Sequence, residues 1–272
     1  MADKPPKSRY VMFALAAMLT AFAPWTLAQN GLLATTTGHQ LGLTLSGYKY
    51  EEPGYMSLKA NKVGLDYVGT VAFPSQWPRS DEPWFFRGEL RLASGQVDYS
   101  SKSTGSMSGK DDWYGEARAL FGRDLNMGGY YLAPYAGLGF RQLHNDLRGS
   151  SSTGNNGYRR VNTLWVLPLG VTHKIALAGR SQLHTSLEYV PLLAGRQESR
   201  RSDASPFLSD VQLRQKAGHG LKLQVIWQGD TWSLGPVLSY WRIRQSETAG
   251  SPAVFEPNNR TSEIALRAGY RF

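Results

Sequence analysis

The 272-residue chain contains no cysteine. This excludes a disulfide framework, a thiolate metal site and a cysteine nucleophile. Long hydrophobic runs are also scarce, with a mean hydropathy of −0.37. A bundle of membrane-spanning helices would need several apolar runs of about 20 residues, so this class is excluded. The aromatic content of 12% argues against disorder, while 29 glycines and 14 prolines predict many turns.

Acidic residues are outnumbered by basic ones, which gives a formal net charge of +9 and a pI near 9.7. A basic surface favours nucleic acid or anionic lipid as a partner. The N-terminus decides between them. Residues 1–10 are basic, residues 11–23 are continuously apolar, and Thr26-Leu27-Ala28 offers small residues for cleavage. Residues 1–28 are therefore expected to be a secretory signal peptide, and export excludes nucleic acid as a partner.

Apolar residues in the remainder, 29–272, recur with a period of two. In the last twelve residues, TSEIALRAGYRF, every second side chain from Ile264 onward is apolar, and the intervening positions include glutamate and arginine. Such alternation predicts strands with one apolar and one polar face. The predicted strands are 39–50, 58–73, 84–99, 113–123, 130–144, 161–174, 181–195, 219–228, 232–245 and 262–272.

The length of these strands and of their connections points to a membrane. Strands of about 10 residues or more suit a tilted crossing of a bilayer. Short turns alternate with long polar links such as 100–112, 146–160 and 196–218, as in outer-membrane barrels. The prediction is an all-β fold: one closed antiparallel up-and-down transmembrane β-barrel of about ten strands, in the bacterial outer membrane.

Two predicted strands break the alternation. Strand 161–174 has apolar residues on both faces, and in strand 232–245 the apolar phase changes along the strand. A β-bulge near Gly235-Pro236 would repair the second strand, because proline does not donate to a ladder.

A closed sheet sends one face to lipid and the other inward. The inward face is expected to carry a mixed charge network that plugs the lumen, because unpaired buried ions are costly. Its predicted members are Asp66, Arg87, Glu89, Arg91, Glu116, Arg118, Arg141, Glu188, Lys222, Arg242, Glu263 and Arg267. The same residues would also suit a narrow porin-like channel. Aromatic residues near strand ends, among them Trp84, Trp113, Tyr131 and Trp241, are expected to form two interfacial girdles.

Arginines in the longer links are expected at the outer rim. Guanidinium groups pair bidentately with phosphate, so these residues are candidates for contact with lipopolysaccharide. They are Arg148, Arg159, Arg160, Arg196, Arg200 and Arg201.

Three segments, PYAGLGFR at 134–141, EYVPLLAGRQESR at 188–200 and EPNNRTSEIALRAGYRF at 256–272, resemble a family of poorly characterised small outer-membrane barrels of Gram-negative bacteria. The alternation that ends in Phe272 resembles the terminal signal that barrel-insertion machinery recognises, carried here by Ile264, Leu266, Tyr270 and Phe272. The resemblance implies the fold and its location, and no activity.

Catalytic interpretations are weak. His184, Ser186 and Glu188 share a strand face as in lipid A deacylases, but residues two apart on a strand are separated by about 6.6 Å, so a direct hydrogen bond is strained. Ten strands is also the count of omptin proteases, yet Asp111, Asp112 and His144 match their acidic pair and histidine–aspartate dyad poorly. No metal or other cofactor is predicted. The expected function is a non-enzymatic barrel in surface interaction or envelope integrity, with an unknown surface ligand; a hydrolase stays an alternative.

Overall fold

The computed structural model describes residues 33–73, 81–251 and 253–272. The predicted signal peptide therefore lies outside the described residues. Strands dominate: β1 (Gly38–Glu52), β2 (Met56–Phe73), β3 (Trp84–Ser101), β4 (Gly105–Arg123), β5 (Leu125–Asn126), β6 (Tyr131–Ser150), β7 (Asn156–Val166), β8 (Leu169–Ala176), β9 (Gln182–Arg200), β10 (Val211–Gln215), β11 (Gly218–Gln228), β12 (Trp232–Ile243) and β13 (Asn259–Arg271), with one 3₁₀ turn, η1 (Arg201–Asp203). Within the described part of the chain, no helix has the length and apolar character needed to cross a membrane.

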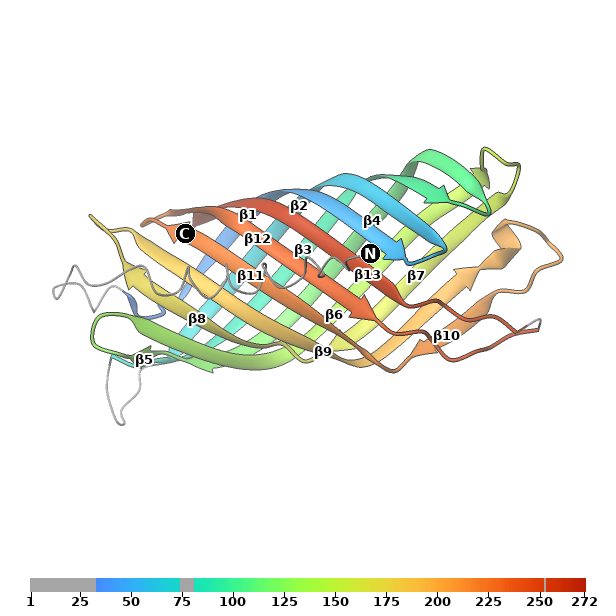
Figure 1. The fold of residues 1–272 in the computed structure, drawn as a ribbon. Helices are drawn as coiled ribbons and strands as arrows, with labels where there is room; N and C mark the ends of the chain where they lie inside the picture. Colours follow the sequence, from blue (N-terminus) through green and yellow to red (C-terminus); the bar gives the residue numbers. More distant parts are fainter. Residues whose placement is uncertain (1–32, 74–80, 252) are drawn as a thin grey trace, which may run out of the picture.

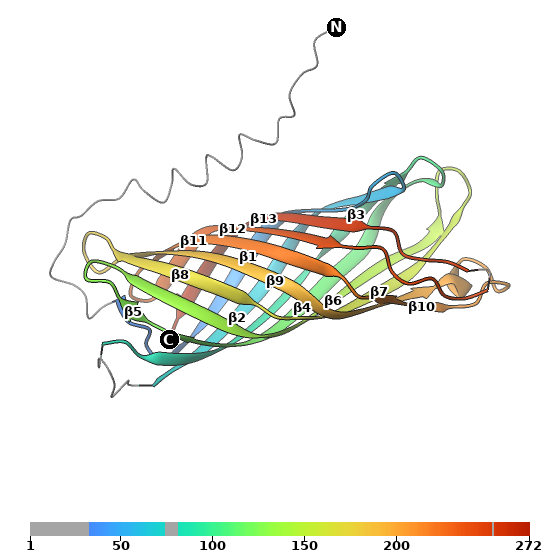
Figure 2. The same ribbon diagram turned by 60° about the horizontal axis from the view of Figure 1, so that its bottom comes forward.

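The strands form one closed antiparallel barrel, seen from two sides in Figures 1 and 2. Each long strand pairs with its neighbours in the sequence, and β1 closes the ring by pairing with β13 from Gln40↔Arg271 to Glu51↔Arg260. Strands β7 and β8 together occupy one position between β6 and β9. The barrel therefore has ten strand positions, as predicted, and both described ends of the chain lie at the end of the barrel that carries the β8–β9 and β11–β12 turns.

The predicted strand 161–174 is interrupted at Leu167-Pro168, between β7 and β8. The lost ladder bonds are replaced, because Leu167 N–H donates to Pro191 O and Gly137 N–H to Pro168 O, both at 3.0 Å. Apolar residues occur on both faces here because the inner face packs inside the barrel and the outer face belongs to its apolar outer surface. Trp165 is outward and 53% exposed, whereas Leu164 is 3% exposed and packs inside the barrel.

The predicted bulge at Gly235-Pro236 is wrong. The register of β12 against β13 is unbroken from Trp232↔Tyr270 to Ile243↔Asn259, and Pro236 faces outward. The phase seemed to change because Val237 and Ile243 are apolar residues of the inner face, each 3% exposed.

A bulge lies in β9 instead. Trp165 pairs with Ala194 but Val166 pairs with Leu192, so Leu193 is the extra residue and is 52% exposed. Before Leu193 in the sequence, the even-numbered residues of β9 face inward. After it, odd-numbered residues such as Gln197 face inward.

The outer face carries a continuous apolar belt. Leucine, valine, isoleucine and aromatic side chains around the ring are exposed, for example Leu65 (65%), Leu92 (60%) and Ile264 (67%). At the end that carries the β8–β9 and β11–β12 turns, Trp84, Trp232 and Phe272 continue the belt on its outside. Such a belt on a closed sheet is the signature of a barrel whose surroundings are lipid.

The predicted girdles are partly wrong. Tyr131 is fully buried inside the barrel, and Trp241 packs inside against an apolar cluster. Trp113 is on the outside, 40% exposed, and stacks on His144. A position near the end of a strand does not by itself place an aromatic residue at the rim, because alternation along the strand decides whether the side chain points outward or into the barrel.

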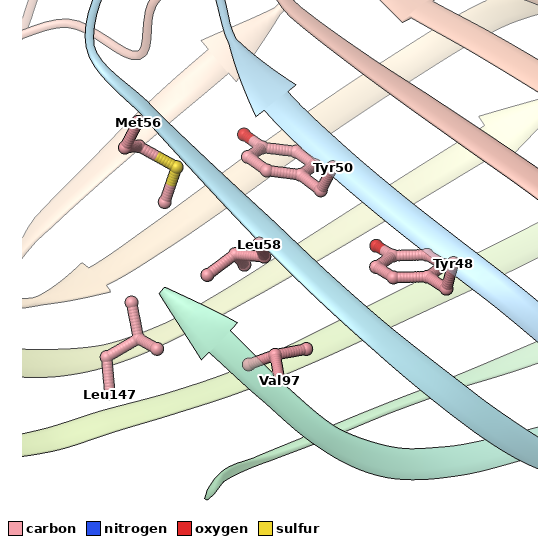
Figure 3. Packing of buried hydrophobic residues seen from close by; sticks show 6 residues of the cluster. All are labelled: Tyr48, Tyr50, Met56, Leu58, Val97 and Leu147. Atoms are coloured by element: carbon pink, nitrogen blue, oxygen red, sulfur yellow. The ribbon is translucent and has the colours of Figure 1, made fainter. Parts of the chain in front are cut away.

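Apolar side chains form two clusters in the outer half of the lumen. One cluster, shown in Figure 3, consists of Tyr48, Tyr50, Met56, Leu58, Val97 and Leu147. A second consists of Leu164, Val166, Val190, Leu192 and Ile243. The barrel thus has a hydrophobic core above its charged middle, which adds burial energy that an open pore would lack.

Candidate functional site: the charged lumen

The middle of the lumen contains carboxylates that each bind groups from distant strands. Glu263 on β13 accepts hydrogen bonds from Arg91 Nη2 on β3 at 3.0 Å and from Tyr114 on β4 at 2.7 Å. β3 and β4 are separated from β13 by two and three strands along the wall, so these bonds cross the interior. Glu263 is 4% exposed, and its charge is matched by a cation and a hydroxyl donor.

Glu188 on β9 forms the second centre. It accepts from Arg118 on β4, with Nη1 at 2.9 Å from Oε1, and from the Tyr135 hydroxyl at 3.0 Å. Arg118 also lies 3.3 Å from Glu89 on β3. A single guanidinium therefore joins three strands across the lumen, and its side chain is only 9% exposed.

Further pairs complete this network. Arg141 bonds Glu116 on the neighbouring strand. Asp66 lies 4.0 Å from Arg91 and 3.9 Å from Arg267, and it also accepts from Thr44. Each acid named in these pairs therefore has a basic partner, as burial requires.

The predicted lumen residues all face inward except Arg242. Lys222 lies on the inner face of β11, beside the cavities that Glu116 and Arg118 also line, and Arg87 lies nearer the periplasmic end over the Phe85 ring. The assignment of Arg242 to the lumen is wrong. Its neighbour Ile243 is buried inside, so the alternation of β12 places Arg242 on the outside, where it is exposed.

Three buried charge clusters escaped the sequence analysis. Lys62 and Asp112, 2% and 3% exposed, pair inside the barrel, with Asn145 as a further donor. Lys174 binds Asp124 at 2.7 Å at the periplasmic end. Parity was the available signal for the first, because Lys62 shares the inward face of β2 with Asp66.

The third missed cluster closes the outer mouth. Arg160 lies 2.5 Å from Glu52 and 3.5 Å from Glu256, and Tyr50 donates to Glu256 at 2.9 Å. Glu256 lies in the link between β12 and β13, outside the strands. Burial raises the pKa of Glu256 to about 7, with a further increase from Glu52 that Arg160 opposes.

The predicted rim arginines are mostly occupied by acids of this chain. Arg148 binds Asp146 at 2.6 Å, and Arg159 binds Asp203 at 2.7 Å. Arg200 lies 3.1 Å from Glu198, with Arg196 at 3.9 Å from the same carboxylate. Arg201 begins η1. Arg160 is not at the rim: its side chain is 15% exposed and faces the lumen, which corrects its assignment to lipid contact.

The Arg159 interaction joins two elements of the structure. Its side chain and its backbone N–H both donate to Asp203, which anchors η1 to β7. The hydrogen bonds from Arg159 hold the pKa of Asp203 at about 2.

The candidate catalytic residues are not assembled into a site. His184 hydrogen-bonds Gln182 at 2.8 Å, Ser186 bonds Thr172 at 2.8 Å, and Glu188 is held by Arg118 and Tyr135. No bond joins the histidine, serine and glutamate of the lipid A deacylase interpretation.

The omptin-like residues are separated as well. Asp112 is buried with Lys62, while Asp111 is exposed and His144 stacks on Trp113 on the outside. Among the described residues, no group of three or more histidine, aspartate or glutamate side chains is placed to hold a metal ion.

A closed antiparallel barrel with a lipid-facing apolar belt and a charged interior defines the class: this is a bacterial outer-membrane β-barrel. The chain is similar to solved structures of outer-membrane proteins. The outer membrane protease OmpT from Escherichia coli is 12% identical with a TM-score of 0.53, over 87% of this chain and 96% of that chain. The translocator domain of the autotransporter NalP from Neisseria meningitidis is 12% identical with a TM-score of 0.39, over 97% and 94%. Neither a family model nor a curated protein matches the chain.

Proposed function

We propose that this chain is a non-conducting outer-membrane barrel that serves surface interaction or envelope integrity, with a sealed lumen as its structural support. The observation that carries the proposal is the set of buried ion pairs that crosses the lumen, centred on Glu188 and Glu263. Opening a water path through them would require both charged partners to separate, and breaking one buried pair by losing a partner costs about 3–5 kcal/mol. Two apolar clusters above the network add a second seal.

A narrow channel is the alternative that a specific observation favours. The periplasmic end contains roughly 1390 Å³ of empty space, counted to its open mouth and lined by polar residues such as Arg87, His184 and Arg271. The charged middle separates this space from the outer surface. In the sealed interpretation it is a water-filled vestibule.

Conductance decides between these functions. The folded protein, inserted into planar bilayers at neutral pH, is expected to give no steady open steps. Folded insertion is verified separately by reconstituting the same preparation into vesicles and recovering the heat-modifiable gel band. Steady unitary steps from verified preparations would overturn the sealed barrel and establish the channel.

Export and assembly belong to the same proposal. Residues 1–28 are proposed to direct secretion, and the C-terminal strand to be recognised by barrel-insertion machinery. The outward exposure of Ile264, Leu266, Tyr270 and Phe272, between 53% and 67%, supports this, because a recognition signal must be accessible. Deletion of Phe272 is expected to slow assembly in cells, measured by the appearance of the heat-modifiable form.

A further inference from the structure

The outer surface holds a pair of arginines that no acid of the described chain neutralises. Arg242 on β12 and Arg260 on β13 lie directly opposite each other in the ladder, and both are exposed on the outside. They line an open hollow of roughly 610 Å³, counted to its open mouth, together with Tyr55, Phe255 and Pro257. Like charges directly opposite each other in a sheet are unfavourable, so this arrangement costs stability unless an anion is bound.

Nearby carboxylates are engaged elsewhere. Glu51 on β1 is opposite Arg260 but pairs with Lys49 at 2.5 Å. Glu256 is close in sequence, yet it is buried and directed toward Arg160 and Tyr50. On the other side of Arg242, the facing residue on β11 is His219, which adds no negative charge. The hollow is thus an electropositive site.

Its height on the barrel selects the anion. Along β12 the outward residues change from Leu238, 41% exposed, through Tyr240 to Arg242. Along β13 they change from Ile264 to Arg260 over four residues, which is about 13 Å of strand. An aromatic residue at the end of an apolar belt marks the headgroup level. The arginine pair therefore lies just outside the hydrocarbon, where lipid phosphates are found.

We propose that the hollow between Arg242 and Arg260 binds a phosphate of the lipid A headgroup in the outer leaflet. Two guanidinium groups supply charge-assisted, bidentate hydrogen bonds to the phosphate oxygens. The exposed rings of Tyr55 and Phe255, at 55% and 40%, supply apolar faces for the attached sugar. This site differs from the loop arginines that the sequence suggested, most of which are already bound by Asp146, Glu198 or Asp203.

The test compares two double variants that remove equal charge. The folded barrel in detergent is titrated with bisphosphorylated lipid A, and complexes are counted by native mass spectrometry. R242Q/R260Q is expected to lower the affinity at least tenfold, while R196Q/R200Q, which alters the exposed arginines beside Glu198, changes it less than threefold. Both variants are first checked for the heat-modifiable folded form.

Two further titrations of the wild-type barrel identify the ligand. Dephosphorylated lipid A is expected to bind the wild-type barrel as weakly as bisphosphorylated lipid A binds R242Q/R260Q. Inorganic phosphate at millimolar concentration is expected to leave the lipid affinity unchanged. Equal losses in the two double variants, equal binding of both lipids, or displacement by free phosphate would each overturn the proposal.

Discussion

Individual residues in this barrel are constrained by the side of the sheet they occupy. An arginine on the inner face, such as Arg118, is held by two carboxylates, whereas an outward arginine such as Arg242 has none among the described residues. Residue type alone did not distinguish them; parity did. For glutamates too, the contribution to the free energy of unfolding depends on whether the side chain is buried in the lumen or exposed on the outside.

Glu188 provides the residue-scale test of the lumen network. Glu188→Ala leaves Arg118 with only Glu89 and removes the acceptor of Tyr135, so the free energy of unfolding is expected to fall by about 3–5 kcal/mol. Glu198→Ala removes a carboxylate that is 27% exposed and paired with Arg200, and is expected to cost at most about 1 kcal/mol. Urea titrations in lipid vesicles measure both, and equal costs would contradict a sealed, buried network.

Titration of Glu256 is expected to make the stability of the barrel depend on pH. Its folded pKa of about 7 lies above its ordinary value of 4.5, so its contribution to stability is fully present below pH 4.5 and is lost as the pH rises through 7. The thermal midpoint of unfolding is expected to decrease as the pH is raised from 5.5 to 8. Glu256→Gln, which keeps an acceptor without charge, should reduce this fall, and an unchanged pH profile in the variant would assign the dependence to other groups.

At the scale of a strand, the lipid face is tested most directly on β13. Leu266 is outward and 53% exposed within the apolar belt. Leu266→Arg is expected to cost about 2–4 kcal/mol and to impair insertion, because a charge near the bilayer centre is poorly solvated. Ser262→Arg, on the same face but beyond the belt, is expected to cost about 0–1 kcal/mol. Folding yields into vesicles compare the two, and equal yields would contradict the face assignment.

Strands were predictable from the sequence because most have one apolar and one polar face, a pattern that period two reveals directly. The exceptions have a common physical origin. In β7 and β12 the inward residues Leu164, Val237 and Ile243 are apolar: Leu164 and Ile243 belong to an apolar cluster inside the barrel, and Val237 lines its charged middle. A pattern assigned to one apolar face therefore predicted a false bulge in β12 and missed the bulge at Leu193 in β9.

Ion-pair partners were less predictable than strands. Pairs such as Lys62 with Asp112, or Arg160 with Glu52, join residues 50 and 108 positions apart in the sequence. Inward parity identified candidate charges, but which charge meets which depends on the register and tilt of every intervening strand. A sequence read strand by strand does not contain that information explicitly.

The whole molecule depends on closure between its first and last strands. Ser46 and Ala265 face each other across the β1–β13 seam on the inner side, and both are buried. The neighbouring outward pair His39 and Phe272 exchanges both backbone hydrogen bonds, so alternation makes the inward pairs the closer type, about 4.5 Å between Cα atoms. That spacing suits a disulfide.

Because the chain contains no natural cysteine, any disulfide must form between the introduced thiols. Ser46→Cys/Ala265→Cys is expected to form an intramolecular disulfide on oxidation, and the oxidised barrel should resist unfolding in hot detergent until reductant is added. Ser46→Cys/Thr261→Cys places the second thiol four residues along the same inner face, about 13 Å away, and is expected to stay reduced. Efficient crosslinking of the second pair, or none of the first, would mean that the β1–β13 seam has a different register.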